Sequence, residues 1–158
     1  MLDTYTFENY TVNKNNEFAY SAAKAIVRLL GSAYNPLFIY GESSAGKTHL
    51  LYSIKNELSK NGKDIKVYYT TSERVIDELS SYKQNVDVLL IDNFQLFNGK
   101  YEIQDELITI FKQLLRNNKQ IVISSDMELN KLDLLEELKN QINMGLFADI
   151  QNAMERKC

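Results

Sequence analysis

Short apolar runs alternate along the chain with longer segments in which apolar residues recur at helical spacing. Most of the short runs are apolar throughout, which is typical of strands with both faces covered by other elements. We therefore predict five strands, at residues 37–40, 66–70, 86–92, 120–124 and 146–150. The sequence contains no internal repeat and no low-complexity linker, so the pattern runs unbroken from end to end.

The longer segments predict amphipathic helices between these strands. In residues 101–116 the apolar side chains follow helical spacing, with charged residues between them. Residues 17–30 and the segment around residues 50–58 carry a similar apolar stripe. The charged run 131–141 is interpreted as the solvated face of a further amphipathic helix.

Strands that alternate with helices predict an α/β fold with a five-stranded, largely parallel sheet and right-handed crossovers. A chain of 158 residues has the size of one common domain. We expect residues 1–158 to form that domain, with an N-terminal segment and helix at 1–35 and a core at 36–158. Because ligands of such sheets bind off the carboxyl ends of the strands, the loops at those ends are the first candidates for a site.

Composition narrows the class of protein. With 44% hydrophobic and 25% charged residues, the chain is that of an ordered globular protein. The formal net charge of −3 provides no overall attraction to phosphate polymers, so direct DNA binding is expected to be weak or absent.

The single cysteine, Cys158, has no partner for an intrachain disulfide. With no signal peptide and no run of ~18 apolar residues, we predict a cytoplasmic protein that makes no membrane contact.

The sequence GESSAGKT, residues 41–48, lies between a predicted strand and a helical pattern. It matches the P-loop pattern G-x-x-x-x-G-K-[ST] in full, in the strand–turn–helix context that the motif requires. The glycines let consecutive N–H groups point inward, and the helix adds its positive N-terminal end. The expected nucleotide contacts of this loop are Gly41, Ser44, Ala45, Gly46, Lys47 and Thr48.

Two residues of the loop define the ligand. Lys47 is expected to reach the β- and γ-phosphates, and the Thr48 hydroxyl is expected to bind Mg²⁺. We therefore predict ATP or ADP with Mg²⁺. His49 follows inside the helix; with no second ligand at helical spacing, it is interpreted as a packing residue or a neighbour of the nucleotide rather than a metal ligand.

A P-loop site also needs an acidic residue at a second strand end to orient the magnesium, and Asp92 closes the apolar run of DVLLIDN. Asn93 follows it, and an amide cannot accept a proton as a carboxylate does. The strand QIVISSD is expected beside the P-loop strand, with Asp126 aimed at the γ-phosphate or the attacking water. Candidate catalytic positions are therefore Asp92, Asn93 and Asp126; candidate metal ligands are Thr48 and Asp92.

With these residues in place, the chain resembles the bacterial replication initiators of the DnaA family, specifically the nucleotide-binding core of their AAA+ module. The likeness is carried by YTFENYTVNKNNEFAYSAAKAI, YNPLFIYGESSAGKTHLL, VDVLLIDNFQLFNGK, KQIVISSD and MGLFADIQ. The first stretch resembles the family's segment near the adenine. The expected nucleotide contacts therefore include Asn16, in this stretch, and also His49.

The chain departs from the family's pattern at four points. Asn93 replaces the acidic residue that normally follows the Walker B aspartate. EELKNQINMGL puts Glu137 and Gln141 where the family's arginine-finger segment has two arginines. The stretch before VDVLL is shorter than the family's segment that contacts single-stranded DNA. The sequence ends at Cys158, before the family's helical lid and DNA-binding domain, so we expect neither here.

The resemblance and its departures lead to one functional hypothesis. We expect an ATP-binding protein of replication initiation or its regulation, at most a weak ATPase, whose partner is DnaA or another replication AAA+ protein. AAA+ subunits assemble head to tail, and this chain is expected to accept a neighbour on its nucleotide face without donating an arginine finger. The alternatives are a helicase loader-type ATPase, a slow independent ATPase, or a fragment of a full initiator.

Overall fold

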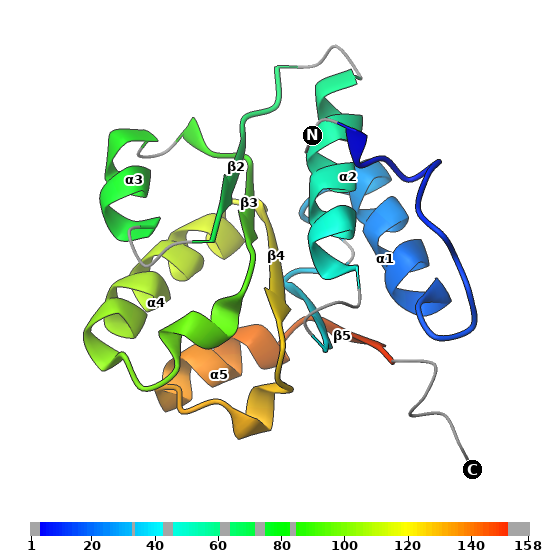
Figure 1. Ribbon diagram of the computed structural model, residues 1–158. Coiled ribbons are helices and arrows are strands. Elements are labelled where there is room, and N and C mark those ends of the chain that lie inside the picture. The colour runs from blue at the N-terminus through cyan, green and yellow to red at the C-terminus, as the bar shows by residue number, and fades with distance from the viewer. Residues whose placement is uncertain are drawn as a thin grey trace.

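The computed structural model describes residues 4–32, 34–42, 46–60, 64–71, 75–82 and 85–151. In these residues, strands and helices alternate as the sequence predicts (Figure 1). The strands are β1 (Leu37–Gly41), β2 (Val67–Thr70), β3 (Val88–Ile91), β4 (Gln120–Ser125) and β5 (Leu146–Ile150). The α-helices are α1 (Glu17–Arg28), α2 (Lys47–Lys60), α3 (Val75–Tyr82), α4 (Tyr101–Arg116) and α5 (Glu136–Asn143). Two short 3-10 helices, η3 (Phe94–Phe97) and η4 (Leu129–Lys131), follow β3 and β4.

The five strands form one sheet in the order β2-β3-β4-β1-β5. Every neighbouring pair is parallel, which confirms the α/β fold and the parallel sheet. β1 lies between β4 and β5, with Leu37 opposite Val122 on one side and Leu146 on the other. The carboxyl ends of β1, β3 and β4 therefore meet at one edge of the sheet, where the P-loop begins.

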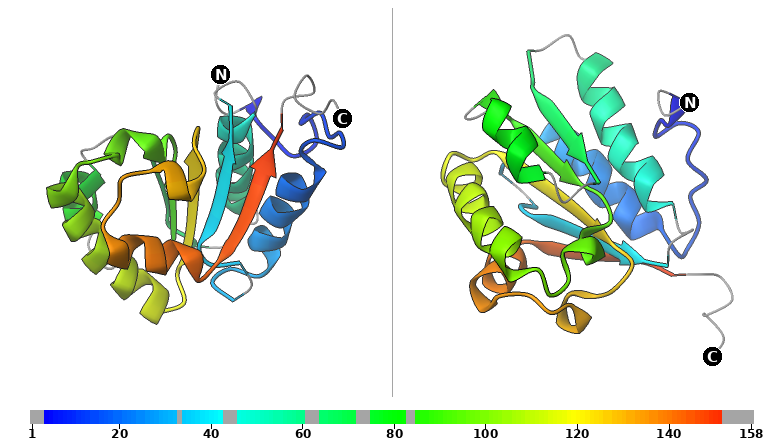
Figure 2. Two further views of the ribbon diagram at one scale, coloured as in Figure 1. Left: turned by 90° about the horizontal axis from the view of Figure 1, so that it is seen from below. Right: turned by 60° about the vertical axis from the view of Figure 1, so that its left-hand side comes forward.

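Helices cover both faces of the sheet, giving three layers (Figures 1 and 2). Helices α1 and α2 pack on one face with Leu90 and Val88 of β3, whereas α3, α4 and α5 pack on the other with Leu89 and Ile91. Because successive side chains of a strand point to opposite faces, a strand covered on both sides must be apolar throughout. This explains the solid apolar runs.

The N-terminal residues before α1 lie along α2. The side chain of Asn56 donates to the carbonyl of Tyr5 (2.8 Å), and the Tyr5 ring stacks on the imidazole of His49 with ring centroids 4.6 Å apart. From α1, Tyr20 donates its hydroxyl to the carbonyl of Phe7 (3.3 Å). These contacts bring the N-terminal segment close to the start of α2 and hence to the P-loop.

The prediction of a helix over 131–141 was wrong for its first half, because α5 begins only at Glu136. The side chain of Gln104 in α4 forms hydrogen bonds with the backbone just before α5. Its Nε2 donates to the carbonyl of Asp133 (3.0 Å), and its Oε1 accepts from the N–H of Leu135 (2.7 Å). Asn98 accepts a further bond from the N–H of Asp133. Backbone groups engaged by another element are not free to form helical bonds, so residues 132–135 stay outside a helix.

Other boundaries differ less. β3 covers only the centre of the predicted strand 86–92, and α1 ends at Arg28 rather than at residue 30. Helix α3 was not predicted, since its short stretch VIDELSSY gives little periodicity to recognise. These differences leave the layers and the sheet order unchanged.

Candidate nucleotide-binding site

The P-loop joins the carboxyl end of β1 to the N-terminus of α2. Ser44 and Ala45 lie outside the described residues, whereas Gly41 and Gly46 flank the turn. A Cβ at Gly41 would clash with the carbonyl oxygen of Ile150 in β5. Gly46 has φ +91°, a conformation that other residues rarely adopt. Both glycines are thus required by the local geometry, as the motif indicates.

Lys47 extends its side chain back across the loop. Its Nζ donates to the carbonyl oxygens of Gly41 (2.7 Å) and Glu42 (2.6 Å), and lies 3.3 Å from Oδ1 of Asp126. The side chain is only 3% exposed. A fixed ammonium group therefore lies beside Gly41 and Glu42, paired with the carboxylate that follows β4.

Asp92 follows β3 and is 1% exposed. Its Oδ2 accepts bonds from the hydroxyls of Thr48 (2.6 Å) and Tyr69 (2.7 Å), and its Oδ1 accepts one from Ser124. Three hydroxyl donors from three separate elements therefore hold the buried carboxylate. Burial of the ring, and to a smaller extent the hydrogen bond to Asp92, raises the pKa of Tyr69 well above its usual range. This hydroxyl therefore stays protonated.

The hydroxyl oxygen of Thr48 and the carboxylate oxygens of Asp92 are suitable ligands for Mg²⁺, which prefers hydroxyl, carboxylate and phosphate oxygens. Their direct contact shows that both side chains reach the same point. Within the described ranges, no three His, Cys, Asp or Glu side chains gather as a metal cage. Magnesium usually binds through one or two protein groups plus substrate phosphates and waters, so this donor set suits a metal that arrives with a nucleotide.

Asn93 and Asp126 are joined by a residue that sequence reasoning missed, Gln95. Its Oε1 accepts from the N–H of Asp126 (3.0 Å), while its Nε2 donates to Oδ2 of Asp126 (3.2 Å) and Oδ1 of Asn93 (3.4 Å). Asn93 itself adopts the left-handed conformation (φ 61°), with its N–H bonded to Oγ of Ser124 (3.0 Å). Two candidate catalytic side chains therefore belong to one hydrogen-bond network.

Two further expected nucleotide contacts have their polar groups engaged within the protein. Nε2 of His49 lies 2.8 Å from the carbonyl oxygen of Thr6 and 2.9 Å from Oδ1 of Asn9. Asn16 donates to the carbonyl of Thr11 (3.0 Å) and accepts from the N–H of Asn13 (2.9 Å). Both side chains thus organise the N-terminal segment beside the P-loop, and direct contact with a nucleotide stays a prediction for both.

Tyr10 packs against the P-loop from the same segment. A Cβ at Gly46 would lie 3.2 Å from its hydroxyl oxygen, and the ring meets His49 edge-on with centroids 5.0 Å apart. Burial raises the pKa of Tyr10 to about 12. The N-terminal segment therefore packs aromatic rings against Gly46 and the first turn of α2.

The two positions where the family has arginines face inward or onto a neighbouring helix. Gln141 is 7% exposed, and its Nε2 donates to the carbonyl of Ile108 in α4 (2.9 Å). Glu137 pairs with Lys112 of α4 (3.0 Å). Residues 117–151 contain no arginine, so α5 and its flanking segments offer no guanidinium.

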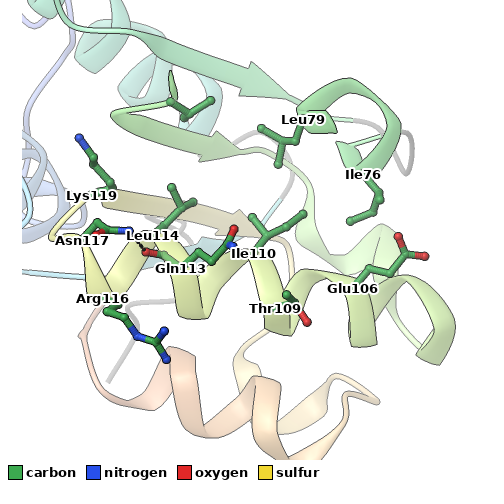
Figure 3. Close-up of a pocket in the computed structure, with 11 residues that line it drawn as sticks. Ile76, Leu79, Glu106, Thr109, Ile110, Gln113, Leu114, Arg116, Asn117 and Lys119 are labelled. Carbon is green, nitrogen blue, oxygen red and sulfur yellow. Dashed lines mark hydrogen bonds between the residues drawn. The ribbon is translucent and has the colours of Figure 1, made fainter. Parts of the chain in front are cut away.

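A cavity of about 940 Å³ lies elsewhere, between α3 and α4 (Figure 3). Its apolar part comes from Ile76 and Leu79 of α3 and Leu114 of α4, with Lys119 at one end. Lys119 precedes β4 and is paired with Asp87 (2.8 Å), at the amino ends of the strands. This cavity is therefore separate from the P-loop, which lies at the carboxyl ends.

The profile of the bacterial DnaA ATPase domain matches residues 1–149 of this chain. The chain belongs to the bacterial DnaA family. It is 42% identical over 161 residues to the chromosomal replication initiator protein DnaA of Thermotoga petrophila, an alignment that covers 93% of this chain and 36% of that protein. The chain thus spans about a third of the length of its curated DnaA relatives.

Solved DnaA structures have the same fold. Domain III of the Thermotoga maritima replication initiation protein DnaA superposes with a TM-score of 0.83 at 42% identity, over 92% of this chain and 66% of that one. A DnaA bound to AMPPCP and single-stranded DNA gives a TM-score of 0.85 at 35% identity, over 94% and 50%. The sheet is therefore that of a DnaA AAA+ core.

The helicase-loader alternative has weaker support. The structure of DnaI gives a TM-score of 0.78 over 98% of this chain and 92% of that one, but at 19% identity. At that identity the likeness shows the fold alone. The comparisons thus connect this chain to the DnaA family rather than to the helicase loaders. In the part of the chain that the structure describes, no helix is both long and apolar enough to cross a membrane.

Proposed function

We propose that this chain binds ATP or ADP with Mg²⁺ and acts in the initiation of DNA replication or in its regulation. The supporting observation is that Lys47 and Thr48, at the start of α2, contact the carboxylates of Asp126 and Asp92, which follow β4 and β3. A related DnaA was solved with AMPPCP, an adenine nucleotide, which supports the choice of base. Cytoplasmic location is part of the same proposal.

The phosphates are expected to bind at the start of α2, where backbone N–H groups and the helix dipole favour an anion. Lys47 now donates to two neutral carbonyl oxygens. A phosphate oxygen is a stronger acceptor because it is charged, so the ammonium group gains by turning toward it. Magnesium, held by Thr48 and Asp92, would neutralise part of the phosphate charge.

Turnover of the bound nucleotide is expected to be slow. Asn93 holds the position of the usual second acidic residue, and its amide oxygen is bonded to Gln95. Asp126 is a nearby carboxylate, but Gln95 holds it through its Oδ2 and its backbone N–H. Because Gln95 engages both side chains and an amide cannot act as a base, we propose a nucleotide-binding protein that is at most a weak ATPase.

Assembly is expected to be one-sided. Head-to-tail contacts between AAA+ subunits are heterologous, so each subunit must offer two different faces. The face that carries Lys47, Thr48 and Asp92, here called the nucleotide face, has the polar groups that a nucleotide requires. Gln141 on α5, by contrast, is buried against α4. We propose that the chain accepts a DnaA subunit at its nucleotide face and ends the assembly there, because its own α5 supplies no charge to a neighbour's phosphates.

The nucleotide proposal is tested by titrating the purified chain with a fluorescent ATP analogue. Lys47→Ala removes charge-assisted bonds and is expected to weaken binding by roughly 100-fold. The matched control is Lys60→Ala, an exposed lysine at the other end of α2, which is expected to bind as the unaltered chain does. Equal affinities for the two variants would reject the P-loop as the binding site.

The assembly proposal is tested by adding the chain, at increasing molar ratio, to a full-length DnaA that oligomerises with ATP. Light scattering is expected to show shorter oligomers as the ratio rises, and Lys47→Ala is expected to lose this effect. Oligomer length that does not change with added chain would contradict the proposal. Fluorescence anisotropy with a labelled single-stranded oligonucleotide checks that direct DNA binding by the chain is weak.

A further inference from the structure

We propose that Tyr69 is a positioning residue for the magnesium-binding carboxylate Asp92. The inference rests on the proposed nucleotide function and assigns a role to a residue outside the P-loop and Walker B motifs. Tyr69 belongs to β2, one of the two edge strands of the sheet, and lies opposite Leu90 of β3. Side chains two residues apart in a strand share a face, so Leu90 and the position of Asp92 both face α2.

The register explains how the hydroxyl reaches the carboxylate. Tyr69 and Leu90 pack into the same apolar cluster under α2. Asp92 lies two residues beyond Leu90, on the diagonal from Tyr69, a separation that an aromatic side chain can bridge. The resulting bond, from the Tyr69 hydroxyl to Oδ2 of Asp92, measures 2.7 Å.

The ring of Tyr69 is itself held in place. It packs against Tyr52 of α2 with ring centroids 4.3 Å apart and an angle of 45° between the planes. Tyr52 is one turn from Thr48 on the same helix, and Thr48 donates to the same Oδ2 (2.6 Å). The edge strand and the P-loop helix are thus tied to one carboxylate oxygen.

The three hydroxyl bonds determine what Asp92 can still offer. A carboxylate has about four lone-pair sites; Thr48, Tyr69 and Ser124 occupy three of them. The carboxylate is therefore fixed in orientation and retains acceptor capacity for a metal ion or a metal-bound water. Groups that orient a metal ligand typically change metal affinity by about 10- to 100-fold when removed.

The test compares Tyr69→Phe with the unaltered chain by titrating a fluorescent ADP analogue, once with Mg²⁺ and once with EDTA. Tyr69→Phe keeps the ring and its packing but removes the hydroxyl. We expect the gain in affinity that Mg²⁺ confers to fall by about 10-fold, with the affinity in EDTA unchanged. The matched control is Tyr101→Phe, which also removes a hydroxyl bonded to a carboxylate, that of Asp133 (2.7 Å), at the exposed start of α4.

Each result decides the matter. A magnesium-dependent gain in Tyr69→Phe equal to that of the unaltered chain would overturn the proposal. Equal losses with Mg²⁺ and with EDTA, or unfolding of the variant in a thermal melt, would also overturn it, since they indicate a structural role only. If the unaltered chain bound no nucleotide, the proposed function would fall as well, so the two failures are distinguishable.

Discussion

At the carboxyl ends of the strands, Lys47 pairs with Asp126 and Thr48 donates to Asp92. On α5, by contrast, Gln141 and Glu137 bind groups of α4. The two regions adjoin the same sheet. One keeps polar groups that a ligand can use, and the other uses its polar groups to hold helices together. The difference indicates that one part of a fold can keep polar groups available to a ligand while another part uses its polar groups for packing alone.

The largest expected effect comes from restoring an arginine at the buried position of α5. Gln141→Arg places a charge where the side chain is 7% exposed and removes the bond to the carbonyl of Ile108. We expect the free energy of unfolding to fall by about 3 kcal/mol, because a buried charge without a partner is costly. Urea denaturation measures this, with Asn140→Arg, an exposed neighbour on the same helix, as the control.

If Gln141→Arg were as stable as the unaltered chain, α5 would be able to present position 141 to a neighbour. The contrast between the two regions would then be a matter of side-chain identity alone. The variant would also be expected to lengthen DnaA oligomers in the mixed-assembly assay.

The next effect concerns turnover on the nucleotide face. Asn93→Asp supplies a carboxylate at the position after Asp92, and aspartate tolerates the left-handed backbone seen there (φ 61°). We expect ATP hydrolysis to rise by about 100-fold, the lower end of what general base catalysis contributes. The double variant with Lys47→Ala should show no such rise, and an unchanged rate in Asn93→Asp alone would mean that another group limits turnover.

A smaller effect is expected from Gln95, which joins Asn93 to Asp126. Gln95→Leu leaves the N–H of Asp126 without its partner. The free energy of unfolding is expected to fall by about 1–2 kcal/mol, the usual cost of an unpaired polar group. Chemical denaturation provides the measurement, and Gln113→Leu on the exposed side of α4 provides the control. No difference between the two variants would show that the network contributes nothing to the stability of the nucleotide face.

The smallest effect is expected at the surface of α5. Glu137→Ala removes the ion pair with Lys112, in which both side chains are more than half exposed. Exposed pairs are screened by water, so we expect a change of less than about 0.5 kcal/mol in the free energy of unfolding. A loss above about 1 kcal/mol would show that this pair, and not only Gln141, fixes α5 onto α4.

Much of the nucleotide face was predictable because its residues follow one another in a short motif. Gly41, Gly46, Lys47 and Thr48 lie within eight positions, and the strand and helix on either side were visible from their periodicity. Asp92 was found from the end of an apolar run. Gln95 and Tyr69 were missed because neither type of residue signals a site, and each contacts the site through a partner distant in the sequence.

The sequence by itself determined the layers, the parallel sheet and the P-loop, since these follow from local periodicity and from glycines that the turn requires. It also determined that α5 has no arginine to offer. Only the tertiary structure decided that Gln141 points inward, that Tyr69 reaches Asp92, and that Gln104 keeps residues 132–135 out of a helix. Each of these depends on a hydrogen bond between residues far apart in the chain, and such bonds leave no periodic trace in the sequence.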